Sequence, residues 1–518
     1  MKTRLYCALA TLLGVTLALA LTWLGAATPA RADPNVRCVN QTGTGCDLGI
    51  CGGGCYASVQ AAIDAAVAGN EIRVAGGVYT STAGTVAAIT RELRILGGYA
   101  SDLGSFDPDV YHTVLDAQWG ESVVSITNAG DILLLNLMLT HGDGTGNCLS
   151  TLGCGGGVYI QGTTLHMGHC VITNNVGSMV GGGRGGGLYA HGSAVEIWGS
   201  VIVSNTASAD PSTTLHAYGG GIYVDSFSGA PSVSLRDNQF LDNVGHVSSQ
   251  GRGGGLYLNG LTGVEVLTNT FRGNRATTYN ATSGWGGGLD IEVCSGVYVA
   301  GNRIENNVTH PNSAYSGYGG GVYIYGSDAH LARNVIFGNT TSQGGGVFIR
   351  SEQPVTLSNN LIALNGPYGG GVHVTEYYTP SVSRALLVNN TIADNGGSGV
   401  VASFYAVVTL TNNIVAGHAT GLYTWTPFSG TISATTNLFW NTADPITGTH
   451  AVLANPLLTT DYHLLRGSPA LNAGLTIPWL TTDLEGHPRP QDGKYDMGAF
   501  EGAVGHQIYL PVVLRNHP

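Results

Sequence analysis

Two carboxylates lie two residues apart in the segment GWGGGLDIEVCSG, residues 284–296: Asp290 and Glu292. On a β-strand both would face the same side, about 7 Å apart at the backbone. Asp225 holds the position of Glu292 in an earlier copy of the same pattern. Carboxyl groups about 6.5–9.5 Å apart suit an inverting glycosidase, so Asp225, Asp290 and Glu292 are catalytic candidates. The same side chains could simply form a polar face, and this interpretation is the favoured one.

The segment is one copy of a repeat that runs through most of the chain. Glycine triplets followed by an aliphatic residue recur every 25–34 residues, beginning at Gly155, Gly185, Gly219, Gly253, Gly286, Gly319, Gly344 and Gly369. A second landmark, Asn-x-apolar-x-x-Asn, recurs between the triplets, from Asn238/Phe240/Asn243 to Asn390/Ile392/Asn395. Repeats of this length predict a solenoid, here of about eleven coils.

Each coil is predicted to consist of short strands, because apolar and polar residues alternate after each triplet, as in GGGVYIQG (155–162). Stacking the coils buries the apolar face and pairs the backbone edges, with a rise of about 4.8 Å per coil. Glycine allows the backbone to bend tightly between strands. Asparagine tolerates the left-handed region, and its amide can hydrogen-bond to the equivalent amide of the next coil.

Residues at equivalent positions of successive coils should stack into outward-facing columns. The first column reads Tyr159, Tyr189, Tyr223, Tyr257, Asp290, Tyr323, Phe348 and His373, and the second Gln161, His191, Asp225, Asn259, Glu292, Tyr325, Arg350 and Thr375. Aromatic rings stack on sugars and acids accept hydroxyl hydrogen bonds, which predicts a carbohydrate-binding strip. The candidate ligand-binding residues are Tyr223, Tyr257, Tyr323, Tyr325, His191 and Arg350. Alternatively, the tyrosine ladder only stabilises neighbouring strands.

The N-terminal segment is predicted to direct export. Lys2 and Arg4 precede an apolar run, and Ala30-Arg31-Ala32 supplies a cleavage pattern, so residues 1–32 are expected to be removed; an uncleaved membrane anchor is the alternative. The mature chain then has 17 Lys and Arg against 32 Asp and Glu, a net charge of −15. Nucleic acid is an unsuitable partner for this charge. We expect a secreted or cell-surface protein that meets a membrane only through this segment or an unknown anchor.

Eight cysteines remain after residue 32, which agrees with an oxidising compartment. Four of them cluster at Cys38, Cys46, Cys51 and Cys55, where we expect two disulfides whose pairing stays open. A bridge between Cys148 and Cys154 is expected across a short loop. Cys170 and Cys294 fall in different repeats, too far apart to pair, and are expected to be buried free thiols.

The chain resembles the right-handed parallel β-helix proteins of the pectin-lyase-like superfamily. Residues 56–80 are similar to the entry of that fold, with a short capping helix over Val59–Val67 and a first strand running into Gly77-Val78-Tyr79. The Gly and Asn landmarks resemble repeats of polymorphic outer-membrane proteins. The segments at 467–474 and 483–501 resemble the closing module labelled choice-of-anchor. The resemblance implies an all-β fold: a right-handed parallel β-helix with an N-terminal capping helix.

Activity does not follow from this resemblance, since the superfamily contains polysaccharide lyases, hydrolases and adhesins. The motifs Asn-Thr-Asp, Asp-Asp, Gly-His-Gly and Arg-Ile-Lys of its polygalacturonase-like members are absent. No cofactor or metal site is predicted. Calcium is the one ion that acids of the C-terminal segment could hold, although turn formation is the favoured role of Asp483, Glu485, Asp492, Asp496 and Glu501.

The expected organisation has six parts: a signal peptide (1–32), a Cys-rich segment (33–55), the cap and first coils (56–128), the repeats (129–445), a closing module (446–503) and a tail (504–518). The favoured function is binding of a polysaccharide or cell-surface glycan without catalysis. A polysaccharide lyase or glycoside hydrolase that uses Asp225, Asp290 or Glu292 is the second hypothesis. A structural spacer without a ligand is the third.

Overall fold

The computed structural model describes residues 33–503, apart from residues 48, 83, 149–150, 227–230, 280–282, 311–316, 368–369, 377–380, 426–429 and 444–447. The expected signal peptide, the tail and Gly369 therefore lie outside the described residues. No helix in the described part of the chain is long and apolar enough to cross a bilayer.

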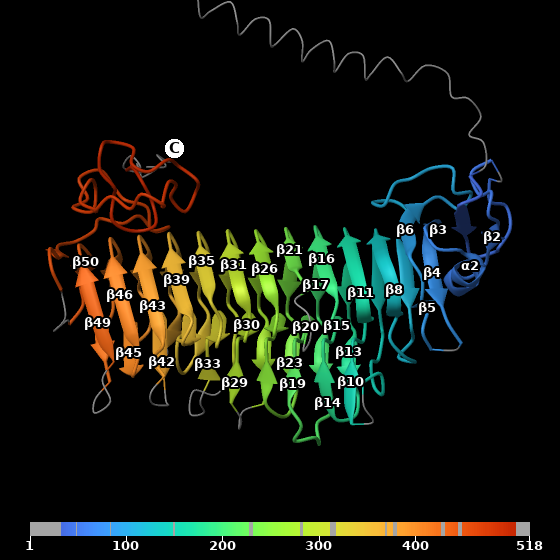
Figure 1. Cartoon of the computed structure of the whole chain (residues 1–518), viewed down its shortest axis with the longest axis horizontal. Coiled ribbons are helices and arrows are strands. Elements are labelled where there is room, and N and C mark those ends of the chain that lie inside the picture. Colours follow the sequence, from blue (N-terminus) through green and yellow to red (C-terminus); the bar gives the residue numbers. More distant parts are fainter. Residues whose placement is uncertain are drawn as a thin grey trace, which may run out of the picture.

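The fold is a right-handed parallel β-helix, as predicted (Figure 1). Within the described residues, the coils build one sheet of 25 strands and another of 14 strands, together with three small sheets. One coil shows the plan, with strands β25 (Leu256–Asn259), β26 (Thr262–Leu267), β27 (Thr270–Arg272) and β28 (Arg275–Thr277). Strands β25, β26 and β27 each pair in parallel with their counterparts in the next coil, and β28 pairs with β23 (Val244–His246) of the preceding coil. The apolar residues thereby stack into a continuous core.

A short helix covers the N-terminal end of this core. Helix α2 spans Val59–Ala65, and the Ser58 hydroxyl caps it by accepting a hydrogen bond from the Ala61 amide at 3.2 Å. Val59, Ala62 and Ile63 are buried against the first coil. The capping helix predicted over Val59–Val67 is confirmed. It ends two residues earlier because Ala66 already has an extended backbone.

Two ladders of asparagine side chains run along the β-helix, from Asn175 to Asn395 and from Asn238 to Asn437. In each coil the Asn amide donates to the Oδ1 of the next Asn, as from Asn274 to Asn307 at 2.9 Å. The predicted amide-to-amide bonds are therefore confirmed. The left-handed backbone was placed wrongly, since it belongs to the preceding residue, as at Asp242 (φ 51°) and Asn306 (φ 55°).

A side sheet covers part of the outward-facing columns. Its strands immediately precede the glycine triplets: β10 (Leu152–Cys154), β14 (Gly182–Arg184), β19 (Ala217–Tyr218), β24 (Gly251–Arg252), β29 (Gly284–Trp285) and β33 (Gly317–Tyr318). They lie along the lower edge in Figure 1. A Cβ on Gly287 would collide with the Gly320 carbonyl oxygen of the next coil. Glycine in the triplets therefore permits the backbones of neighbouring coils to approach each other closely. The side sheet ends at β33, where the triplet spacing falls from 33 to 25 residues.

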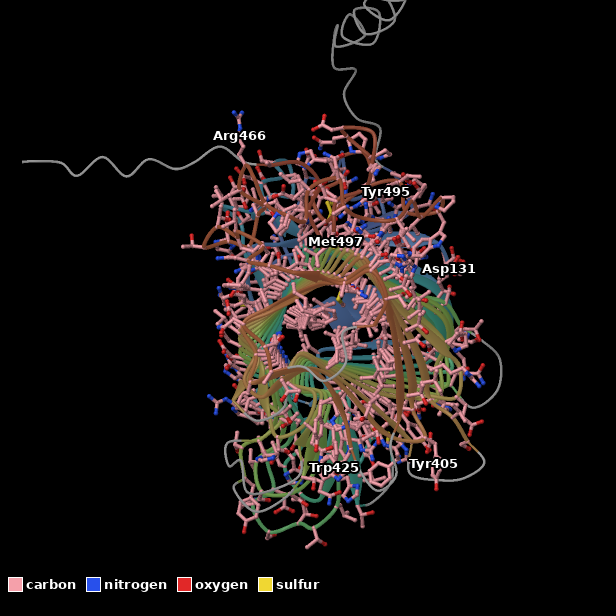
Figure 2. The ribbon with its side chains drawn as sticks, turned by 90° about the vertical axis from the view of Figure 1, so that its left-hand side faces the viewer. Asp131, Tyr405, Trp425, Arg466, Tyr495 and Met497 are labelled. Carbon is pink, nitrogen blue, oxygen red and sulfur yellow. A yellow bond between two sulfur atoms is a disulfide. The ribbon has the colours of Figure 1, made fainter. Side chains whose placement is uncertain are left out.

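The C-terminal segment folds back over the flank of the last coils (Figures 1 and 2). Asn389 Nδ2 donates to the Asp496 carbonyl at 2.8 Å, and the Ala499 amide donates to the Thr391 hydroxyl at 3.0 Å. Tyr462 and Phe500 complete a small apolar core with residues of the 14-stranded sheet. The segment is thus packed beside the coils.

The disulfides follow the expected grouping. Cys38 pairs with Cys51 and Cys46 with Cys55, which settles the pairing that the sequence left open. Cys148 pairs with Cys154, and Cys170 and Cys294 are buried free thiols, as predicted.

Removing the Cys148–Cys154 bridge should destabilise the protein moderately. The cysteines are separated by 6 residues, and a bridge that closes so short a loop lowers the entropy of the unfolded chain. This effect stabilises the folded protein by about 2 kcal/mol. We expect the variant C148S/C154S to lose about this free energy of unfolding, measured by urea denaturation. Equal stability of the variant and the parent protein would contradict the expectation.

Candidate functional site

The strand register confirms both predicted columns over the coils in question. Tyr257 pairs with Asp290, which pairs with Tyr323, and Asn259 pairs with Glu292, which pairs with Tyr325. The expectation of an exposed aromatic strip is wrong, however. Tyr223, Tyr257 and Tyr323 are 3–5% exposed. The side sheet covers them, because Tyr218 of β19 packs its ring 5.2 Å from that of Tyr257.

A third column completes the site and was missed in the sequence. It consists of the residues directly before the triplets, and runs through Arg184, Tyr218, Arg252, Trp285 and Tyr318. An arginine or an aromatic residue at this fixed position in five successive repeats was the available signal. These side chains face the first column across the gap between the side sheet and the 25-stranded sheet.

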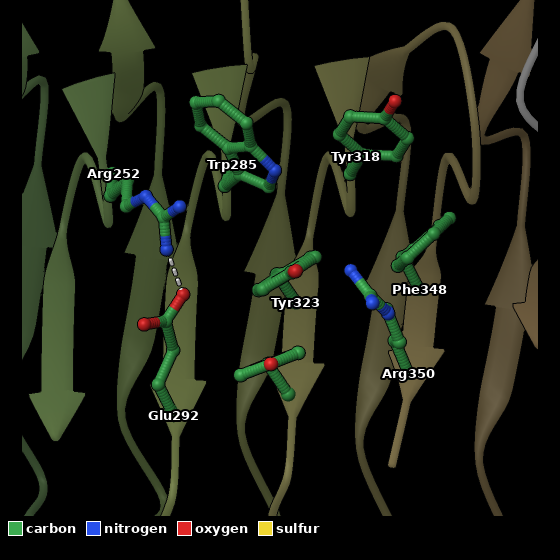
Figure 3. A pocket seen from close by; sticks show the side chains of 8 residues that line it. Arg252, Trp285, Glu292, Tyr318, Tyr323, Phe348 and Arg350 are labelled. Atoms are coloured by element: carbon green, nitrogen blue, oxygen red, sulfur yellow. Dashed lines mark hydrogen bonds and ion pairs between the residues drawn. The ribbon is translucent and has the colours of Figure 1, made fainter. Parts of the chain in front are cut away.

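A cleft of about 390 Å³ opens where the side sheet ends (Figure 3). It is lined by Arg252, Trp285, Glu292, Tyr318, Tyr323, Tyr325, Phe348 and Arg350, contributed by β24, β29, β30 (Leu289–Glu292), β33, β34 (Val322–Tyr325) and β38 (Val347–Arg350). The Trp285 and Tyr318 rings stack at a centroid distance of 6.0 Å, and the Tyr325 ring is 37% exposed. The cleft therefore offers several ring faces to a ligand.

Each arginine of the cleft lies over an aromatic ring and beside a carboxylate. The Arg252 guanidinium is 4.5 Å from the Trp285 ring centroid and forms an ion pair with Glu292. Arg350 is 5.3 Å from the Tyr325 centroid, and its Nε is 3.4 Å from a Glu376 oxygen. Cation–π contact and ion pairing together fix both guanidinium groups at the cleft wall.

Glu292 lines the cleft and has a partner on each oxygen. Arg252 pairs with Oε1, and the Tyr257 hydroxyl donates to Oε2 at 2.8 Å. The side chain is 11% exposed. Among the three catalytic candidates, it alone contributes to the cleft surface.

Asp290 lies behind this surface and is fully buried. Neither of its oxygens has a hydrogen-bond partner among the described residues. Burial, with the nearby Glu292 charge, raises the pKa of Asp290 well above its usual value, and Arg252 opposes the shift. Burial therefore favours the protonated form of this carboxyl group, which does not line the cleft.

Asp225 belongs to a separate cluster on earlier coils. It is fully buried, and its Oδ1 lies 2.6 Å from His191 Nδ1 and accepts a 3.3 Å hydrogen bond from the Tyr189 hydroxyl. None of these residues lines the cleft. Of the residues predicted from the sequence, the structure places Glu292, Tyr323, Tyr325 and Arg350 in the cleft wall. Tyr257 contacts the cleft residue Glu292 by a hydrogen bond. The residues that do not line the cleft are Asp225, His191 and Tyr223.

A second hollow of about 290 Å³ continues from the first and shares Tyr325 and Arg350 with it. Its walls also include Glu352, Gln353 and Glu376. The two hollows draw largely on the same coils, and their combined lining, from Arg252 to Glu376, spans several successive coils. Together they form a groove that crosses these coils.

The acids of the C-terminal segment are engaged in turns and ion pairing. Asp483 accepts hydrogen bonds from the amides of Glu485 and His487, and Glu501 pairs with Arg489. Within the described residues, no three His, Cys, Asp or Glu side chains are grouped to hold a metal ion. The calcium hypothesis stays a prediction.

The coils stack in parallel, a helix caps the first of them, and a groove lies on their outer face. These features define a right-handed parallel β-helix protein. Residues 311–439 match the family model described as a right handed beta helix region. The resemblance to outer-membrane repeats and to the closing module stays a prediction.

Three solved structures are similar to this chain in fold alone. The periplasmic alginate epimerase AlgG has 14% identity over 74% of this chain and 77% of its own, with a TM-score of 0.36. XylC in complex with xylose has 9% identity, covering 90% and 98%, with a TM-score of 0.45. Pectate lyase Pel9A has 13% identity, covering 90% and 96%, with a TM-score of 0.30. No curated protein matches the chain.

Proposed function

We propose that this protein is an exported polysaccharide-binding protein whose ligand lies in the groove lined by Trp285, Tyr318 and Tyr325. The observation that carries the proposal is the set of accessible ring faces beside fixed polar groups in one continuous groove. Sugar rings present apolar faces that stack on aromatic side chains, and hydroxyls that bond to arginine and carboxylate groups. A groove that crosses several coils suits a chain ligand better than a compact one.

The charge of the chain supports a glycan partner over nucleic acid. The residues expected after export carry a net charge of −15, and the two arginines of the groove are paired with Glu292 and Glu376. A phosphate backbone needs unpaired cations along its path. Uncharged hydroxyl groups do not.

Polysaccharide cleavage is the second candidate, because Glu292 and Glu376 line the two joined hollows. A lyase or hydrolase needs a carboxylate or other base that reaches the ligand. Of the three catalytic candidates predicted from the sequence, Asp290 and Asp225 do not line this groove and Glu292 does.

The test incubates residues 33–518 with a panel of neutral and acidic polysaccharides, with and without calcium. Calorimetry measures binding, and analysis of released oligosaccharides detects cleavage. The variant W285A should bind at least about tenfold more weakly, since a central stacking aromatic contributes about 1.4 kcal/mol or more. W440A is the matched control, because Trp440 is 44% exposed and lies outside the groove.

The possible results separate the three hypotheses. Binding that W285A weakens and E292Q largely preserves supports the binding function. If the parent protein released products and E292Q released none, catalysis would replace binding as the proposed function. Failure of every polysaccharide to bind would overturn both and leave a structural spacer.

A further inference from the structure

A carboxyl group and a guanidinium group near the groove wall, those of Asp290 and Arg252, contain buried atoms without a hydrogen-bond partner in the described part of the chain. Asp290 Oδ1 and Oδ2 have no partner among the described residues, and neither does Arg252 Nε. Asp290 and Arg252 nevertheless lie close enough for each to shift the other's pKa. Arg252 is therefore flanked by two carboxyl groups and is paired with only one of them, Glu292.

We propose that Asp290 is a positioning residue for Glu292: when Asp290 loses its proton, Arg252 turns to it and leaves Glu292 in the groove with the Tyr257 hydroxyl as its remaining partner. The proposal rests on the groove of the proposed function. Burial favours the neutral form of Asp290, and in the described arrangement Arg252 pairs with Glu292 at the groove wall. After the proton leaves to solvent, a buried carboxylate would need a counter-ion, and Arg252 is the cation whose charge already lowers the pKa of Asp290.

The position of Asp290 explains why an acid is placed here. Its counterparts in neighbouring coils are Tyr257 and Tyr323, whose larger side chains fill the same column. Asp290 is shorter than these tyrosines and fills less of the column, and the nearby Arg252 guanidinium lies 4.5 Å from the Trp285 ring centroid. A tyrosine at this position would offer no second charge.

Few other groups around Asp290 can change charge in the same pH range. The titratable groups that face it or its partner Arg252 are Glu292 on the same strand, Cys294, Tyr218, Tyr257, Tyr323 and His216. Burial raises the pKa of the three tyrosines, and that of Cys294 to about 12, so they stay neutral below pH 9. Burial lowers the pKa of His216, which requires the control variant H216Q.

The test follows the Trp285 fluorescence of the ligand-free protein between pH 4 and 9, taken as the difference between the parent protein and W285F. We expect a transition centred above the ordinary Asp pKa of about 3.9, because burial favours the protonated carboxyl group. It should be absent in D290N and in D290Y, which restores the residue of the neighbouring coils, and unchanged in H216Q. In E292Q it should move to lower pH, because the like charge is removed.

The result does not depend on a ligand, so it is separable from failure of the proposed function. A transition that persists in both D290N and D290Y, or none in the parent protein, would overturn the proposal even if polysaccharide binds. Failure of every polysaccharide to bind, with the transition present, would instead overturn the proposed function alone.

Discussion

The variant N307A should unfold with a free energy at least about 4 kcal/mol lower than that of the parent protein. Asn307 is fully buried at the centre of one asparagine ladder. Its Nδ2 donates to the Phe271 carbonyl and to Asn339 Oδ1, both at 2.9 Å. Its Oδ1 accepts from the backbone amide of Asn274 at 3.0 Å and from its side-chain amide at 2.9 Å. Alanine would remove these four buried hydrogen bonds, at about 1 kcal/mol each, and the Asn274 backbone amide would lose its acceptor. Asn339 Oδ1 would keep the Asn307 backbone amide, and Asn274 Nδ2 would keep the Phe240 carbonyl.

Urea denaturation followed by circular dichroism measures this loss. N259A is the matched control, because Asn259 lies one coil away, is only half-buried and belongs to neither ladder. The control should change the free energy of unfolding by less than about 1 kcal/mol. If the two variants were equally stable, the ladder would contribute nothing beyond the removal of an asparagine, and its structural role would be refuted.

The repeat landmarks were sufficient to predict the β-helix and its register. Glycine triplets fix where each strand begins, so the pairing of Asp290 with Tyr257 and Tyr323 followed from counting residues. The capping helix was also predictable, because Ser58 and the apolar residues after it form a local pattern. Such features depend on contacts between equivalent positions, which a single repeat already encodes.

The groove was not predictable in the same way, because it depends on where an inserted strand stops. The residues between the Asn landmark and the next triplet form the side sheet, and their number falls after Tyr318. Only the folded insertion shows that Trp285 and Tyr318 come to face Tyr325. The side sheet likewise buries Tyr223 and Tyr257, which alternation alone placed at the surface.

The sequence identified Asp290 as unusual but not its chemistry. A polar residue in an alternating strand indicates an outward side chain, and Asp290 does point away from the β-helix core. Asp290 is fully buried, and Arg252, whose charge acts on it, belongs to the side sheet and lies outside residues 284–296. The charge state of a carboxyl group depends on such distant neighbours, so it could not be read from residues 284–296.

The variant R489A should release the C-terminal segment from the flank of the β-helix. Arg489 and Glu501 form an ion pair in which neither side chain is more than 1% exposed. Arg489 also donates to the Gly498 carbonyl at 2.8 Å and to the Asp496 carbonyl at 3.2 Å. Removing one partner of a buried pair leaves an uncompensated charge and costs about 3–5 kcal/mol.

Limited proteolysis with mass spectrometry detects this release, as new cleavage between about residue 456 and residue 502 before the coils are cut. R466A is the control, because Arg466 is exposed and points outward in Figure 2. The double variant R489M/E501L should recover part of the resistance, since it replaces both charges with apolar groups. If R489A were as resistant as R466A, the ion pair would not hold the segment, and its attachment would have to rest on the Asn389 and Thr391 hydrogen bonds and the Phe500 core.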